Sequence, residues 1–222
     1  MLSILLCLFF AFITNRYTPH EFSTKTTLLV QSDNNTKNPI AQILYGEDQF
    51  SMQNSLNDEI LILQSYPLIY NTVTALGYEV QYLIQGDIKT VETYVWRPID
   101  FVSKGDEKGY GLEIVIEIIN DQEFILTSNQ MEGGKFFFNE ELDFRNSKFS
   151  IRLNEKFNFH EGYENAPTIM VRWKNPHNVA KKYKNKLIVE KIKLDASIIQ
   201  VGLIGEDVSK ETTFLNKLTA LY

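Results

Sequence analysis

The chain has few of the residues that carry most enzyme and metal chemistry. Its 222 residues include one cysteine, Cys7, so no disulfide can form within the chain and a cysteine-based zinc site is excluded. The three histidines fall in separate predicted loops, without the i, i+4 spacing that sets two metal ligands on one helix face. They are His20, His160 and His177. We therefore expect no metal site.

Motifs for phosphate binding and nucleophilic catalysis are also missing. The sequence contains neither the loop G-x-x-x-x-G-K-[ST] nor the elbow G-x-S-x-G, and the pair Gly202 and Gly205 fits a strand–loop junction. The acidic runs 57–59 and 140–143 lack calcium-loop spacing. We expect no catalytic, cofactor-binding or metal-binding residues, no cofactor, and no enzymatic activity in this chain.

A net charge of −6 argues against nucleic acid as the main partner, because a protein that neutralises many phosphates usually has a basic surface. At 44% hydrophobic and 23% charged residues, the composition is that of a globular protein with a sizeable core. One local basic patch is expected to be a solvated loop or strand edge. It consists of Lys181, Lys182, Lys184 and Lys186.

Residues 1–13 form an apolar run without a charge. Three interpretations compete: part of a transmembrane helix, a secretory signal peptide, or a buried core helix. A signal peptide would need a basic leader and a small-residue cleavage site, and a core helix normally keeps a polar stripe. The run is shorter than the ~20 residues of a full span. We therefore expect a partial transmembrane helix over 1–14, in a chain that begins partway into the span, with Arg16 and Tyr17 as interfacial anchors.

Residues 15–98 are predicted to combine a strand, a broken helix and two further strands. The β-branched run 22–31 predicts the first strand. Apolar positions at helical spacing over 54–76 predict a helix, which Pro67 kinks or splits in two and Gly77 ends. The helical region is expected to bury two stripes: Leu56, Ile60 and Leu63, and then Ile62, Tyr66, Ile69, Val73 and Leu76.

An alternating strand follows the broken helix over residues 78–85, and another strand over 90–96 is ended by Pro98. Alternation predicts that one face of the strand 78–85 is buried. That face consists of Tyr78, Val80, Tyr82 and Ile84.

Residues 99–176 contain short strands separated by turn signals, with almost no helical period. This pattern predicts an antiparallel β-rich insert, for which two packed layers are one arrangement. The insert is rich in phenylalanine. Alternating burial along its strands explains these residues better than a sugar-stacking platform does. They are Phe136, Phe137, Phe138, Phe144, Phe149, Phe157 and Phe159.

Residues 177–222 are predicted to return to helices and strands. A short helix or loop over 179–186 precedes two strands, over 187–194 and 197–203. A final helix is expected to begin at Ser209 as its N-cap, and its apolar stripe continues to Leu221 without a cap. We therefore expect the helix to continue in a longer protein.

Together these elements predict an α+β fold. Residues 15–98 and 177–222 are expected to form a membrane-proximal domain, a mixed sheet with packed helices. The β-rich insert 99–176 interrupts this domain, and the partial transmembrane helix 1–14 precedes it.

Several short segments follow the apolar N-terminal run in a characteristic order along most of the chain: 15–19, 25–30, Asn57-Asp-Glu-Ile-Leu-Ile-Leu-Gln-Ser65, 67–69, 76–82, 92–94, 97–99, 197–203 and Thr213-Phe-Leu-Asn-Lys-Leu218. This order resembles the outward-facing part of the Wzz-type polysaccharide co-polymerases, the chain-length determinants. More narrowly, it resembles the version fused to a cytoplasmic tyrosine autokinase in exopolysaccharide and capsule export. The shared segments are packing patterns without reactive groups.

The resemblance implies a protein that crosses the bacterial inner membrane twice, with this domain facing the periplasm. It also implies assembly into homo-oligomeric rings, work beside a polysaccharide polymerase and an outer-membrane exporter, and an influence on polymer length. Members with a kinase carry Walker motifs and a tyrosine-rich tail in a further domain. This chain carries none of those residues.

Two functions follow as hypotheses. The first is a membrane-anchored, oligomerising scaffold that regulates the chain length and export of a surface polysaccharide, with the helix 54–76 and the continuation of the helix 209–222 as contacts between copies. The alternative is a carbohydrate-binding β module in which exposed aromatic side chains hold glycan. A glycan hydrolase is disfavoured, because it would need two acids placed in a cleft.

Overall fold

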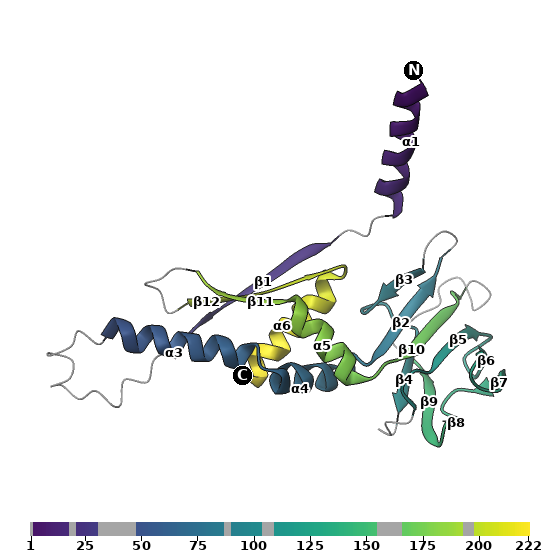
Figure 1. Cartoon of the computed structure of the whole chain (residues 1–222). Coiled ribbons are helices and arrows are strands. Elements are labelled where there is room, and N and C mark those ends of the chain that lie inside the picture. The colour runs from purple at the N-terminus through teal and green to yellow at the C-terminus, as the bar shows by residue number, and fades with distance from the viewer. Residues whose placement is uncertain are drawn as a thin grey trace.

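The computed structural model describes residues 2–17, 21–30, 48–86, 90–103, 109–154, 166–192 and 198–222. These residues form an α+β fold of helices and antiparallel sheets, as expected (Figure 1). The helices are α1 (Leu2–Tyr17), α3 (Asp48–Leu63), α4 (Tyr66–Leu76), α5 (Pro176–Lys186) and α6 (Val208–Leu221). Phe157 and Phe159 of the predicted insert lie outside the described residues.

One part of the molecule is a three-stranded sheet with helices on one face. The strand order is β1–β12–β11, with bounds Phe22–Leu29 for β1, Ile198–Gly205 for β12 and Leu187–Lys191 for β11. Helix α6 packs against β1 and β12, and α4 packs against α5 and α6. The buried residues between them form one hydrophobic core, which includes Val201, Leu203 and Phe214.

All strand pairs among the described residues are antiparallel, so the mixed sheet expected for this part is wrong. The reason is the short connection between β11 and β12, since a parallel pair needs a crossover of a dozen or more residues. β1 then adds to the other edge of β12 in antiparallel register from Phe22 opposite Gly205 to Leu29 opposite Ile198.

The other part is a two-layer β structure. A six-stranded sheet has the order β3–β2–β10–β5–β6–β7 and faces a three-stranded sheet of order β4–β9–β8. The first sheet contains β2 (Val80–Gln85), β3 (Thr90–Thr93), β5 (Glu113–Ile118), β6 (Glu123–Thr127), β7 (Gly134–Phe137) and β10 (Ile169–Trp173). The second contains β4 (Ile99–Ser103), β8 (Glu141–Phe144) and β9 (Ser147–Leu153).

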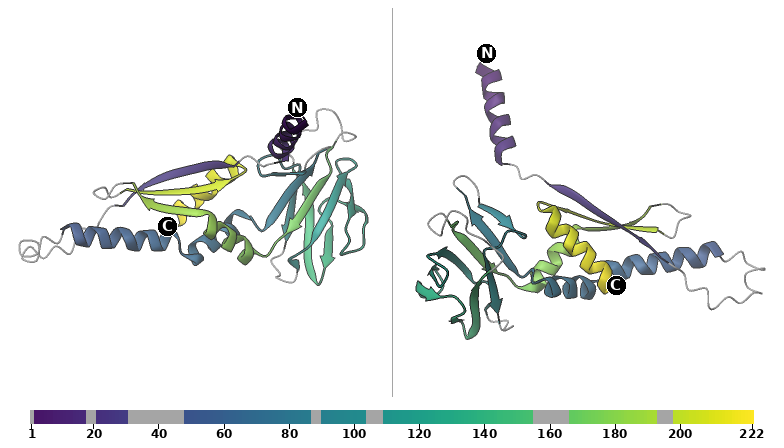
Figure 2. Two further views of the ribbon diagram at one scale, coloured as in Figure 1. Left: turned by 45° about the horizontal axis from the view of Figure 1, so that its top comes forward. Right: turned by 180° about the vertical axis from the view of Figure 1, so that it is seen from behind.

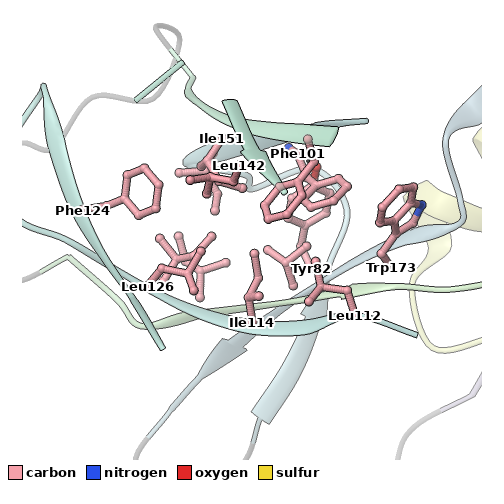
Figure 3. Close-up of a cluster of buried hydrophobic side chains, with 14 of the residues drawn as sticks. Tyr82, Phe101, Leu112, Ile114, Phe124, Leu126, Leu142, Ile151 and Trp173 are labelled. Atoms are coloured by element: carbon pink, nitrogen blue, oxygen red, sulfur yellow. Dashed lines mark hydrogen bonds between the residues drawn. The ribbon is translucent and has the colours of Figure 1, made fainter. Parts of the chain in front are cut away.

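A second hydrophobic core fills the space between these layers (Figure 3). Ile114 and Phe124 reach into it from the larger sheet, and Phe101 and Ile151 from the smaller one. The predicted antiparallel strands in two packed layers are therefore confirmed. β2 and β3, which precede residue 99, pair with the strands of this same sheet.

The predicted break of the first long helical region is confirmed. α3 ends at Leu63 and α4 begins at Tyr66, with Pro67 in its first turn, where the missing N–H costs nothing. Gly77 ends α4 at φ 66°, a left-handed conformation that glycine adopts without steric cost. The predicted burial of Ile62 is wrong, because the break resets the helical phase and leaves this residue exposed.

Two further expectations are corrected. Tyr78 precedes β2 and belongs to the helix-side core, whereas Tyr82 belongs to the core between the sheets. Leu83 on the opposite face of β2 is also buried, so burial does not alternate here as expected. The N-cap of α6 is Asp207 rather than Ser209, since the Asp207 carboxylate accepts a 3.0 Å hydrogen bond from the Lys210 N–H.

Helix α1 stands away from the rest of the chain (Figure 2). None of the α1 side chains that the structure describes belongs to either described core, so the core-helix interpretation is wrong. Its described apolar side chains, among them Leu8, Phe9 and Phe12, are exposed. In the described part of the chain, no helix combines the length and the apolar character needed to cross a membrane.

The core between the sheets should dominate the stability of the β part. We expect Phe124→Ala to lower the free energy of unfolding by about 3–5 kcal/mol, because it removes a fully buried ring and leaves a cavity. Its neighbour Ile125 lies on the solvent side of β6, so Ile125→Ala should cost less than about 1 kcal/mol. Denaturant unfolding measures both, and equal losses would contradict the assigned faces of β6.

Candidate functional site

A cavity of about 500 Å³ lies where the two parts of the molecule meet. Its walls come from α5, the start of α6, strands β2 and β3, and residues beside them. The lining combines charged and apolar side chains. The charged ones are Glu92, Lys174, Lys182, Lys186, Glu206, Asp207, Lys210 and Glu211, and the apolar ones are Phe22, Val91 and Val179.

A charged network ties the β part to α6 across this cavity. The Lys210 ammonium forms an ion pair with Glu92 on β3, and the Gln81 side-chain amide on β2 donates a 2.7 Å hydrogen bond to the same carboxylate. The Tyr78 hydroxyl donates to the Lys210 backbone carbonyl at 2.7 Å. Burial alone raises the pKa of Glu92, but Lys210 and Gln81 outweigh it and hold that pKa below its usual value. Glu92 therefore stays ionised at neutral pH.

The cavity lining contains four lysines and four acidic residues. Burial lowers the pKa of Lys174, Glu92 opposes that change, and Lys182 and Lys210 add to it by repulsion. Glu92 is already paired with Lys210. Within the described residues, neither Lys174 nor Lys182 forms an ion pair. In the described structure Lys174 is therefore a partly buried ammonium group without an ion pair, whereas Lys182 is exposed.

Glu211 is the most buried charged residue of the site, with 6% of its surface exposed. Its Oε2 is buried and finds no hydrogen-bond partner in the described structure, and the same holds for Oε1 of Gln81. Burial raises the pKa of Glu211 above its usual value, opposed by the charges of Lys210 and Lys186. The site therefore contains two buried acceptor atoms with unmet hydrogen-bonding capacity.

Gly205 makes room for this carboxylate. A Cβ atom at position 205 would lie 2.1 Å from Oε1 of Glu211, far inside van der Waals contact. The last residue of β12 and the first turn of α6 are therefore fitted to each other. Of the pair Gly202 and Gly205, predicted to be a strand–loop junction, both lie in β12 and the second ends it.

The histidines do not assemble a metal site in the described structure. His177 stacks on Tyr70 with ring centroids 4.6 Å apart, and the Tyr66 hydroxyl lies 2.5 Å from its Nδ1. His20 and His160 lie outside the described residues. Among the residues that are described, no three His, Cys, Asp or Glu side chains come together.

The acidic run at 140–143 serves local structure. Glu140 accepts a 3.0 Å hydrogen bond from the Phe137 N–H, and Asp143 accepts one of the same length from the Asn146 N–H. Glu141 pairs with Lys148 on the neighbouring strand. None of these acids lines the cavity.

The aromatic side chains of the β part, which the carbohydrate-binding alternative would need exposed on one face, are split between core and surface. Trp173 and Phe138 are buried, and Phe136 packs against the same core. Trp96 and Phe137 are exposed at 42% and 58%, but they lie at opposite edges of the six-stranded sheet, beside β3 and on β7. These two side chains therefore do not form one stacking platform.

Sequence reasoning missed the cavity, because its residues come from separate segments that only the fold unites. One signal was present in the basic patch 181–186. Lys182 and Lys186 are four residues apart on α5 and both line the cavity, while Lys181 and Lys184 are exposed elsewhere on the helix. The patch lies on a helix, as one of the two forms expected for 179–186, and is neither a loop nor a strand edge.

No protein-family profile matches the chain, and no curated protein is significantly similar to it.

The fit between Gly205 and Glu211 predicts a coupled effect on stability. Gly205→Ala should lower the free energy of unfolding by about 1–3 kcal/mol, because the added methyl group overpacks the buried carboxylate. Gly202→Ala is the control, since its Cβ would meet no atom closer than 3.5 Å. The loss should largely vanish in a Glu211→Ala background. An equal loss in both backgrounds would contradict the contact.

The buried carboxyl of Glu211 also predicts a pH dependence. A raised pKa in the folded state means that folding becomes less favourable as the pH rises above the pKa of the unfolded chain. Glu211→Gln should therefore gain stability over the parent at pH 7 and lose that advantage near pH 4, where both states of the parent are largely protonated. Unfolding curves at both pH values test this, and a pH-independent difference would contradict it.

Proposed function

We propose that the chain is a membrane-anchored, oligomerising scaffold at the bacterial inner membrane. It faces the periplasm and regulates the chain length and export of a surface polysaccharide. The observation that carries the proposal is α1, whose described apolar side chains are exposed and join neither core. Such a helix needs an apolar surrounding outside the domain itself, which a bilayer supplies.

Assembly is supported by a second exposed apolar surface. Leu61 and Ile62 on α3 and Leu221 and Tyr222 at the end of α6 are exposed, and the Tyr222 hydroxyl bonds to Glu59 on α3. These four residues form what we term the α3/α6 patch. It lies on the two helical regions that the sequence indicates as contacts between copies. A patch that meets a different surface on the next copy builds a ring when the rotation closes.

The remaining partners follow from the resemblance in element order. A polysaccharide polymerase and an outer-membrane exporter would sit beside the ring, and the ring geometry rather than a reaction would set polymer length. The proposal assigns no catalytic step to this chain. Any kinase activity belongs to a separate domain.

Crosslinking of the full-length protein in membranes tests assembly. We expect a ladder of multimers with an amine- or carboxyl-reactive crosslinker. Leu61→Glu combined with Ile62→Glu should weaken the ladder, because it places charge in the α3/α6 patch. The matched control is Val95→Glu, a residue 73% exposed in the turn after β3. A strictly monomeric product from the unmodified protein would overturn the proposal.

A further inference from the structure

Two short chain segments connect the β part to the sheet β1–β12–β11 with its helices, which we term the helix part. One segment, residues 77–79, leads from α4 into β2, and the other, residues 174–175, leads from β10 into α5 (Figure 1). The segments lie side by side, because the Lys174 N–H donates a 2.7 Å hydrogen bond to the Glu79 carbonyl oxygen. Both connections therefore lie at one place, as the strands of a hinge do.

The packing of the two parts leaves them largely independent. Each part has its own hydrophobic core. In the described structure, the extensive contacts between helices and strands all join elements of the same part. A cavity of about 500 Å³ lies at their junction. Parts of a chain are expected to move relative to each other unless a large apolar interface joins them. The fold therefore permits the β part to rotate on the helix part about the two connections.

One aromatic contact crosses the junction close to the connections. Tyr94, which follows β3, meets the Tyr78 ring edge-on, with the ring centroids 5.4 Å apart. Through this contact Tyr94 packs against the helix-side core. A single pair of rings is far smaller than the apolar interface that would make the two parts rigid.

An ion pair crosses the junction at a distance from the connections. It joins Glu92 on β3 to Lys210 on α6. Glu92 lies opposite Leu83, which is three residues along β2 from Val80, where this strand begins. That separation corresponds to roughly 10 Å along the strand. A contact at this distance from the hinge restricts rotation more than a contact at the hinge itself.

The ion pair is partly shielded from water and held by neighbours. The Lys210 side chain is 16% exposed and the Glu92 side chain 31%. The Gln81 amide donates a 2.7 Å hydrogen bond to the Glu92 carboxylate, and the Lys210 Nζ lies 5.1 Å from the centre of the Tyr78 ring. An ion pair in such a setting is screened less than one on the open surface. It can therefore contribute to fixing the relative position of the two parts.

We propose that the β part rotates on the helix part about the segments 77–79 and 174–175, and that the Glu92–Lys210 ion pair is a latch that holds it in the position seen here. Residues of both parts line the junction cavity, so this rotation changes the width of the cavity. The proposal is based on the two cores and the contacts between them. It depends on neither membrane anchoring nor assembly.

Double electron–electron resonance between two spin labels, one in each part, tests the hinge and the latch. In the full chain with Cys7→Ser, the changes Thr27→Cys on β1 and Glu117→Cys on β5 provide exposed labelling sites. Labelled protein is diluted with unlabelled protein, so that only distances within one copy are measured. We expect a narrow distance distribution for this parent, because the latch keeps the β part in one position.

Variants of the latch should widen that distribution. Lys210→Met should broaden it about twofold or more, because without the ion pair the β part populates further positions. Glu92→Gln, which keeps the shape of the side chain, should broaden it to a similar extent. The double variant should broaden it no further, since both changes remove the same ion pair. The matched control is Lys148→Met, which breaks an ion pair with Glu141 inside the β part and should leave the distribution unchanged.

Several results would overturn the proposal. Equally narrow distributions in the parent and in both latch variants would show a rigid junction without a hinge. Equally broad distributions would show that the ion pair does not restrict the motion. Broadening in only one of the two latch variants, or equal broadening by Lys148→Met, would show that the loss of this ion pair is not the cause.

Discussion

The pairing of β1 with β12 is the constraint on which the rest of this structure depends. It joins residues far apart in the chain over eight positions, from Phe22 opposite Gly205 to Leu29 opposite Ile198. Because α6 begins directly after β12, this ladder sets the helix on the sheet and closes the helix-side core. It also brings Lys210 to Glu92, which ties the β part to the same helix. At the end of this ladder, Gly205 leaves room for the Glu211 side chain. The helix-side core, the junction and the cavity therefore all depend on the pairing of β1 with β12.

The proposed function assigns anchoring and assembly to elements that this ladder connects. The exposed helix α1 precedes β1, so the strand that organises the domain also leads from the proposed anchor. The α3/α6 patch lies on helices that pack on or beside the same sheet. The cavity sits at the junction with the β part, and residues of both parts line it.

The sequence predicts those features that depend on local pattern. Pro67 and Gly77 divide and end the helices, and alternation with turn signals marks the two-layer β structure. Prediction from the sequence fails where tertiary packing determines the structure. The phase reset between α3 and α4 exposes Ile62, and Asp207 caps α6 two residues before Ser209 because its carboxylate reaches the Lys210 N–H. The cavity could not be predicted from the sequence, because the neighbours of Glu211 and Lys174 depend on strand pairings that no local pattern encodes.

The length distribution of surface polysaccharide in the source organism tests the scaffold function most directly. Gel separation of that polymer would be compared for cells with the unmodified gene, a deletion, and the Leu61→Glu, Ile62→Glu variant. The proposed function predicts a preferred polymer length in the first case and its loss in the other two, with the protein still present in the variant. An unchanged length distribution after deletion would contradict a role of this chain in chain-length control.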